Sequence, residues 1–432
     1  MKLMMILIAT IIMGTKAQAA VWADVNQWSQ DWESRYSSWV KNEWNKYFFS
    51  RQLLPNGQSN PYYGFRVDCA DAVYSMRLIF AYENRLPFVI KDPTYSGARI
   101  SNKMSRWDRQ REIERVRSFL NYIHETTSTR SLPGDTYPVA INRKAIRAGG
   151  VLATTAVNHH SWTIKEILPI GVPYLVYNSV VGSHSGFTMQ ERKSWPNPNW
   201  VFEGDFSSSS GAGFRYWRPA SYLSRPVWKV PGYSTEQFQI SLSKWTKTLQ
   251  SRLATQQEDD TSMILRLVEN VCVGFKDRVS YVNEALSYKR QYPSCMSYEA
   301  FDIYSSPSRD ERIFDDLMLL RRTYKEILQR NNGQNLTTDQ KAELTKIFPY
   351  INQSASSETR QMPQQSITED SVCVVNYLSS RTMDMAEFKR RLFAGWISNN
   401  PNERGEYRWG VLRGPSDHAR YCPSWGGWSP NL

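Results

Sequence analysis

The sequence has few of the residues and patterns that mark several common classes of protein. It contains only five histidines and five cysteines among 432 residues. Zinc-finger spacing, a phosphate-binding loop and a recognition-helix pattern are all missing, which argues against nucleic acid as a partner. No internal repeat is found, and no feature calls for a cofactor. After residue 19 there is no apolar run near the length of about 20 residues that a transmembrane helix needs.

The first 19 residues have the pattern of a secretory signal peptide. Lys2 supplies a basic start, residues 4–13 form a short apolar run, and Ala17 and Ala19 provide the small residues of a cleavage site. We therefore expect cleavage after Ala19. The mature protein would then be exported, in the periplasm or outside a bacterial cell, without a transmembrane anchor.

The chain is strongly basic. Its formal net charge is +12, and removal of Lys2 and Lys16 with the signal peptide leaves 12 − 2 = +10. For an exported protein this charge favours an anionic partner in the cell envelope, such as peptidoglycan. Solubility alone explains the charge equally well.

The cysteines fit an exported protein with disulfides. An odd number leaves at least one thiol free when the others pair. Cys69 stands alone in the N-terminal half, and the other four lie in the C-terminal half. From order along the chain, among three possible connectivities, we predict Cys272–Cys295 and Cys373–Cys422, with Cys69 free.

The periodicity of apolar residues predicts helices first, then a sheet, then helices again. Helices are expected at 21–48, 69–84, 103–126, 234–255, 260–287, 309–330, 338–348 and 383–399, and strands at 137–141, 151–157, 159–167, 174–181 and 211–219. This order is typical of an α+β domain with an antiparallel sheet. We divide the chain into a signal peptide (1–19), an amphipathic helix and linker (20–60), an α+β domain (61–232), a helical region (233–351), a linker (352–370), and a C-terminal helix with an aromatic tail (371–432).

Cys69 stands at the predicted start of the 69–84 helix. Unpaired backbone N–H groups and the helix dipole favour negative charge there, which lowers the pKa of a thiol. Cys69 is therefore the candidate nucleophile. The alternative interpretation is a buried structural thiol or half of a disulfide.

A nucleophilic cysteine needs a base, and the base needs an orienting partner. His159 and His160 open a predicted strand, and neighbouring side chains on a strand point to opposite faces. We choose His160, because Trp162 and Ile164 would share its face and pack toward the helix. The next strand offers Asn178 as the orienting residue, with Tyr177 as its rival. Two surface or metal-binding histidines remain an alternative, although no acidic or cysteine ligand lies nearby at metal-binding spacing.

Three short motifs carry a resemblance to a known family. Pro61-Tyr62-Tyr63-Gly64 followed by Asp68-Cys69-Ala70-Asp71-Ala72-Val73 is similar to "P-Y-x-x-G … D-C-S-G-L-V", Leu132-Pro133-Gly134-Asp135 is similar to "L-x-P-G-D", and His160-Ser161-Trp162-Thr163-Ile164 stands where "H-V-G-I-Y" is found. These motifs belong to the papain-like cysteine peptidases of the NlpC type, which are bacterial cell-wall amidases. The chain resembles that family over about 170 of its 432 residues.

The resemblance implies a papain-like domain in which a helix bearing Cys69 packs on a small antiparallel sheet. It implies Cys69 as nucleophile, His160 as base and Asn178 as orienting residue. Tyr62 or Tyr63, together with Asp68, would lie near the oxyanion or the substrate. The substrate would be an amide bond in the stem peptides of peptidoglycan.

Two other functions stay open at this point. A transglutaminase-like acyl transferase would use the same thiol chemistry and pass the acyl group to an amine. A non-catalytic envelope-binding protein with a decayed site is the other alternative, because Ala70-Asp71 replaces the small Ser-Gly pair of the family motif.

Overall fold

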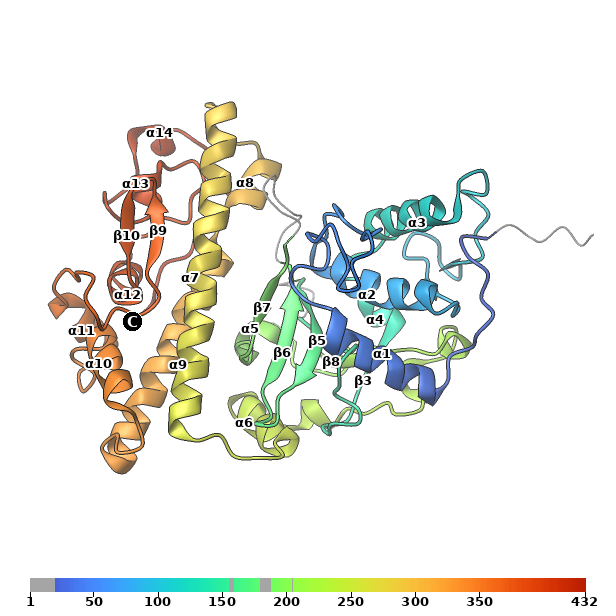
Figure 1. Ribbon diagram of the computed structural model, residues 1–432, viewed down its shortest axis with the longest axis horizontal. Helices are drawn as coiled ribbons and strands as arrows, with labels where there is room; N and C mark the ends of the chain where they lie inside the picture. Colours follow the sequence, from blue (N-terminus) through green and yellow to red (C-terminus); the bar gives the residue numbers. More distant parts are fainter. Residues whose placement is uncertain (1–19, 155–158, 179–187, 204) are drawn as a thin grey trace, which may run out of the picture.

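The computed structural model describes residues 20–154, 159–178, 188–203 and 205–432. The predicted signal peptide lies outside the described residues, as do the ends of the predicted strands at 155–157 and 179–181. The N-terminal half, blue to green in Figure 1, holds the main sheet with its helices. The C-terminal half, yellow to red, is mainly helical and lies beside it.

Three helices dominate the start of the chain: α1 (Gln30–Glu43), α2 (Cys69–Glu83) and α3 (Glu112–Thr126). The bounds of α2 agree with the prediction. Helix α1 is shorter than predicted, because the indole N–H groups of Trp22 and Trp28 donate to the carbonyl oxygens of Leu86 and Pro87. These bonds hold the residues before α1 as an irregular segment along the end of α2.

The main sheet has six strands in the order β3-β8-β4-β5-β6-β7, and every neighbouring pair is antiparallel. The strands are β3 (Thr136–Pro138), β4 (Val151–Ala153), β5 (Ser161–Ile167), β6 (Pro173–Tyr177), β7 (Gln190–Arg192) and β8 (Gly213–Trp217). The predicted α+β class with an antiparallel sheet is confirmed. A small hairpin of β1 (Val89–Lys91) and β2 (Arg99–Ser101) was not predicted.

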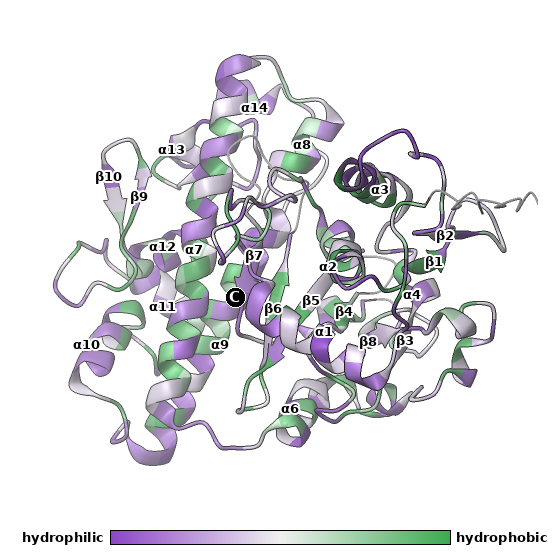
Figure 2. Ribbon diagram, turned by 45° about the vertical axis from the view of Figure 1, so that its right-hand side comes forward, coloured by the Kyte–Doolittle hydropathy of each residue, from purple (hydrophilic) through white to green (hydrophobic). Residues whose placement is uncertain are grey.

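Helix α2 is the buried centre of this half. It contacts α1, α3 and β5, and nearly all of its side chains are buried. Even its charged Arg77 is buried, where its guanidinium pairs with Glu33 of α1 at 2.6 Å and lies over the ring of Trp28. Figure 2 shows the contrast in hydropathy between the mostly hydrophilic α1 on the outside and the hydrophobic strand β4 within. The position of Cys69 is therefore set by packing on several sides.

The C-terminal half is built on two long helices, α7 (Asp260–Gln291) and α9 (Pro307–Asn331), which run side by side (Figure 1). The other elements in the described part of the chain are α4 (Leu132–Asp135), α5 (Pro198–Val201), α6 (Leu242–Leu253), α8 (Tyr298–Tyr304), α10 (Thr338–Ile347), α11 (Ala355–Gln361), β9 (Val375–Leu378), β10 (Arg381–Met383), α12 (Met385–Phe393), α13 (Gly405–Arg408), α14 (Asp417–Arg420) and three 3-10 turns at Ala220–Tyr222, Val227–Lys229 and Glu236–Gln239. None of the helices that the structure describes is long and apolar enough to cross a membrane.

The segment predicted as a linker, 352–370, contains the helix α11. Its Glu358 is fully buried and accepts hydrogen bonds from Arg321 of α9 at 2.8 Å and Lys389 of α12 at 2.7 Å. A buried carboxylate needs such partners. These partners lie far away in the sequence and cannot be recognised from the segment itself. Its polar composition therefore led to the prediction of a linker.

Two disulfides are present, as expected for an exported protein, but the predicted pairing is wrong. Cys272 pairs with Cys373 and Cys295 pairs with Cys422, while Cys69 is free as predicted. Cys272 lies in the middle of α7, whereas Cys295 follows the end of that helix. About 19 helical residues separate the ends of this stretch by roughly 29 Å, far beyond the reach of a disulfide. An unbroken helix therefore excludes the pairing that order along the chain suggested.

Candidate functional site around Cys69

Cys69 is the first residue of α2, and the residues around it form a capping box. Asp68 accepts from the backbone N–H of Asp71 at 2.8 Å, and the Asp71 carboxylate accepts from the backbone N–H of Asp68 at 2.9 Å. The Ala70-Asp71 pair that departs from the family motif thus has a structural role here. Burial raises the pKa of the Asp71 carboxyl, and the neighbouring Asp68 raises it further.

The thiol of Cys69 is enclosed by polar groups from two other segments. Its Sγ lies 3.2 Å from the hydroxyl of Thr129 and 3.8 Å from the carbonyl oxygen of His159. Neither of these two contacts is made by an imidazole. The residue is only 8% exposed.

The expected lowering of the thiol pKa is not found. Burial raises the pKa of the Cys69 thiol, and the carboxylate of Asp68 raises it further, against the hydrogen bonds of Thr129 and Ser161 that lower it. The start of a helix favours a thiolate only where the thiolate keeps a polar or solvated surrounding. In this closed arrangement the sulfur carries its proton at neutral pH.

Strand β5 presents Ser161 to the start of α2. The Ser161 hydroxyl donates to the carbonyl oxygen of Cys69 at 3.0 Å, and Ser161 is fully buried. Alternation along a strand places Thr163 on the same face and Trp162 on the other. The face of β5 that looks at Cys69 is therefore the face of Ser161.

Asn178 lies on this same face. Strands β5 and β6 pair Thr163 with Val176, and continuing that register places Asn178 opposite Ser161. The Asn178 amide donates to the carbonyl oxygen of Val67 at 2.8 Å, two residues before Cys69. The structure thus brings this predicted residue to the Cys69 region.

His160 points away from Cys69. Its ring packs edge-on against Trp162 at 4.5 Å, Tyr177 at 5.7 Å and Trp200 at 5.8 Å, on the opposite face of β5. We expected Trp162 to face the helix that bears Cys69, α2, and this prediction is wrong. Trp162 packs on Trp200 of α5 instead.

The surroundings of His160 are also unlike those of a catalytic base. Its Nε2 is buried without a hydrogen-bond partner in the described part of the chain. Burial, with the nearby charges of Arg312 and Arg192, holds the pKa of His160 well below its ordinary value. The imidazole is therefore neutral and has no contact with the thiol.

His159 lies next to Cys69 through its backbone. Its backbone has a φ of 42°, a left-handed conformation that is uncommon for a residue other than glycine. Its carbonyl contacts the sulfur of Cys69, while its Nε2 accepts hydrogen bonds from Arg130 at 2.6 and 3.0 Å. Burial and the charge of Arg130 lower the pKa of His159.

The two tyrosines of the first motif are not equivalent. Tyr62 is fully buried and stacks on Phe48. Burial raises the pKa of its hydroxyl, and the carboxyl of Glu83 raises it further. Glu83 ends α2, roughly 21 Å along the helix axis from Cys69, so Tyr62 is not placed for an oxyanion role. Tyr63 is 39% exposed.

Thr129, Ser161 and Arg130 contribute to this site and were not predicted. Ser161 carried a usable signal, because small polar residues alternate with Trp162 and Ile164 along the strand. Thr129 and Arg130 carried none, since they lie in the turn between α3 and α4 and are brought near only by the fold.

A group of residues away from Cys69 has side-chain ligand atoms close enough together to hold a metal ion. The side chains of Cys295, His418 and Cys422 lie within 4.8 Å of one another, in the part of the chain that the structure describes. Because the two cysteines form a disulfide, they are not available as thiolate ligands. His418 alone does not make a metal site.

Comparison with known proteins adds no relative to this picture. No protein-family model, no curated protein and no solved structure matches the chain.

Proposed function

We propose that the protein is an exported cysteine amidase or endopeptidase that hydrolyses an amide bond, with peptidoglycan stem peptides as the substrate. The observation that carries the proposal is the placement of its one free cysteine. Cys69 is the first residue of a buried helix, and the polar ends of β5 and β6, with Ser161 and Asn178, pack on that point. The motif resemblance around Cys69 supports the same chemistry.

His159, and not His160, is the base in this proposal. His159 contacts the sulfur through its backbone carbonyl, which places this residue next to Cys69. The proposal requires a change of its side-chain torsions that moves the ring from Arg130 to the thiol. Asn178, on the same face, is the candidate to orient the imidazole.

The reaction follows from these roles. The imidazole takes the thiol proton, and the sulfur forms a bond to the amide carbon. The carbon–nitrogen bond then breaks, and the amine leaves with the proton from the imidazolium. Water, deprotonated by the same imidazole, hydrolyses the thioester and restores the thiol.

Digestion of purified peptidoglycan tests the proposal. The protein and its Cys69→Ala variant are incubated with the wall polymer, and the released fragments are identified by mass spectrometry. New stem-peptide ends that appear with the protein and vanish with the variant support the proposal. A labelled amine in the reaction distinguishes hydrolysis from acyl transfer, because transfer incorporates the label.

A non-catalytic envelope-binding protein is the second candidate. The observation that favours it is the enclosed thiol, whose pKa is raised and which contacts no imidazole. Under this alternative the wall polymer binds equally well to the protein and to Cys69→Ala, and neither releases fragments.

A further inference from the structure

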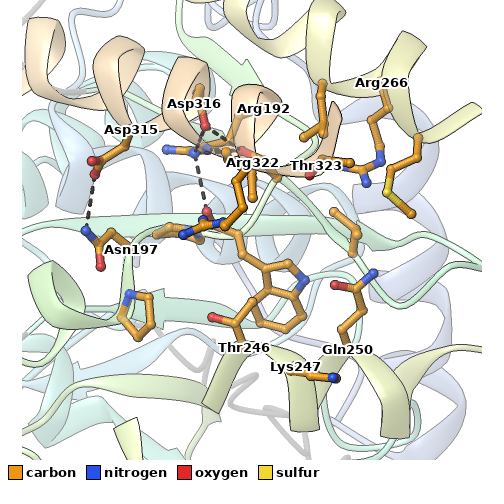
Figure 3. Close-up of a pocket in the computed structure, with 18 of the residues that line it drawn as sticks. Arg192, Asn197, Thr246, Lys247, Gln250, Arg266, Asp315, Asp316, Arg322 and Thr323 are labelled. Atoms are coloured by element: carbon orange, nitrogen blue, oxygen red, sulfur yellow. Dashed lines mark hydrogen bonds and ion pairs between the residues drawn. The ribbon is translucent and has the colours of Figure 1, made fainter. Parts of the chain in front are cut away.

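A large cavity of about 1370 Å³ lies between the sheet and the helical half of the molecule. One wall comes from β5, the loop after β7, α5 and α6, and the other from α7 and α9 (Figure 3). Trp162 lines it, whereas the adjacent Ser161 contacts Cys69 on the other face of the strand. The cavity is therefore separate from the Cys69 site and is backed by the same strand.

An ion pair and a hydrogen bond link the two walls. Arg192 pairs with Asp316 across the two halves at 3.0 Å, and Asn197 donates to Asp315 at 3.2 Å. Both contacts are drawn in Figure 3. Because these groups satisfy one another, they shape the cavity without offering their charges to a ligand.

Two exposed cations on opposite walls form no ion pair in the part of the chain that the structure describes. They are Arg322 of α9 and Lys247 of α6, and both line the cavity. The charge of Arg322 counters the rise that burial causes in the pKa of the Asp315 carboxyl. Figure 3 shows Arg322 extending from α9 and Lys247 on the opposite wall. Three further carboxyl groups, of Glu258, Glu311 and Glu326, also line the cavity, and that of Glu258 pairs with Arg266. Burial raises the pKa of Glu311.

Several lining groups are hydrogen-bond donors that lack an acceptor. The indole N–H groups of Trp162 and Trp195 are buried without a partner in the described part of the chain, as is the hydroxyl of Thr246. An indole can only donate, and so can a guanidinium or an ammonium group. Unsatisfied donors in a cavity of this size point to a ligand rich in acceptors.

We propose that this cavity binds a small carboxylate-bearing ligand rich in oxygen acceptors, with Arg322 and Lys247 holding the carboxylate. The choice of a cell-wall fragment as the ligand rests on the proposed function. Both the acidic sugar and the acidic peptide of that polymer carry the required chemistry.

Isothermal titration calorimetry with small wall fragments tests this site. The Cys69→Ala variant is titrated with N-acetylmuramic acid, with N-acetylglucosamine, which lacks the lactyl carboxylate, and with L-alanyl-D-isoglutamine. Since the variant cannot turn over substrate, binding is measured whether or not the proposed hydrolysis exists. We expect N-acetylmuramic acid or the dipeptide to bind, and the neutral sugar to bind at least about ten-fold more weakly.

Matched variants connect the binding to the cavity. Arg322→Gln and Lys247→Gln, each made in Cys69→Ala, are expected to weaken binding of the acid by about ten-fold. Lys325→Gln on α9 and Lys244→Gln on α6 change neighbouring cations that do not line the cavity. These two variants should leave binding of the acid unchanged. Equal binding of both sugars, no binding of either acid at millimolar concentration, or binding indifferent to Arg322→Gln and Lys247→Gln would overturn the proposal.

Discussion

The hydroxyl of Ser161 donates a hydrogen bond of 3.0 Å to the carbonyl oxygen of Cys69. This bond determines which face of β5 looks at the start of α2. It assigns Ser161 and Asn178 to the side of the thiol, and His160 with Trp162 to the other side. This contact argues against His160, and the carbonyl contact of His159 with the sulfur of Cys69 favours His159.

Ser161→Ala tests the contact through stability. The change leaves a buried carbonyl without its side-chain donor, so we expect the free energy of unfolding to fall by about 1–2 kcal/mol. Urea unfolding measures it. Ser34→Ala is the matched control, because the Ser34 hydroxyl makes the same kind of bond to Gln30 on the exposed side of α1. A loss no greater than that of the control would show that the Ser161 bond contributes nothing.

Asp68→Asn tests the electrostatics of the thiol. Asparagine caps a helix as well as aspartate does, so the helix start is preserved. Loss of the charge removes one of the causes that raise the pKa of Cys69, and we expect its pKa to fall. The pH dependence of iodoacetamide alkylation of the non-reduced protein reports the shift.

Asp108→Asn is the control for this measurement, because Asp108 is an exposed aspartate elsewhere on the surface. It should leave the alkylation profile unchanged. Peptide mapping should find the label on Cys69 alone. An unchanged profile in Asp68→Asn would refute the stated role of the carboxylate.

His124 should make the protein less stable in acid. It is partly buried, with its ring nitrogen 2.7 Å from the Ser75 hydroxyl, and desolvation lowers its pKa to about 4 from 6.5. Between these values the unfolded chain binds a proton that the folded chain does not, so stability falls as the pH drops from about 6.5 toward 4. The full loss of stability is present below the pKa of His124 in the folded state and absent above its pKa in the unfolded state.

His124→Gln should therefore remove about 2–3 kcal/mol of the difference in unfolding free energy between pH 7 and pH 4.5. Urea unfolding at the two pH values measures this. His418→Gln replaces an exposed histidine and should keep the difference of the unmodified protein. If both variants retain it, burial of His124 is not the cause.

The disulfide Cys272–Cys373 closes a sequence separation of 101 residues. Replacing both cysteines by serine releases a long loop in the unfolded chain, and we expect a loss of about 3–5 kcal/mol. Calorimetry of the double variant measures the loss as a lower unfolding temperature. Peptide mapping without reduction checks the pairing directly, and a linked peptide containing Cys272 and Cys295 would contradict it.

Local patterns in the sequence were enough for much of the fold. The apolar spacing after Cys69 predicted α2, and short β-branched segments predicted the antiparallel sheet. Helix α7 was predicted to start at Asp260, as observed. Each of these features depends on residues close together in the chain.

What the sequence did not predict depends on distant partners. The face of β5 was misassigned because Trp162 packs on Trp200, a contact invisible in the strand itself. Helix α11 needed Arg321 and Lys389 to bury Glu358. The raised pKa of Cys69 follows mainly from burial of the thiol under segments that lie far away in the sequence, which no spacing could indicate.

The central claim is that Cys69 acts with His159 as its base. Its most direct test is the rate at which new stem-peptide ends appear in peptidoglycan treated with the unmodified protein, with His159→Gln and with His160→Gln, at equal concentrations of folded protein. We expect His159→Gln to lose 10²-fold or more of the rate, as removal of a general base does, and His160→Gln to keep most of it. Loss of the rate in His160→Gln alone, or no fragments from the unmodified protein, would contradict the account.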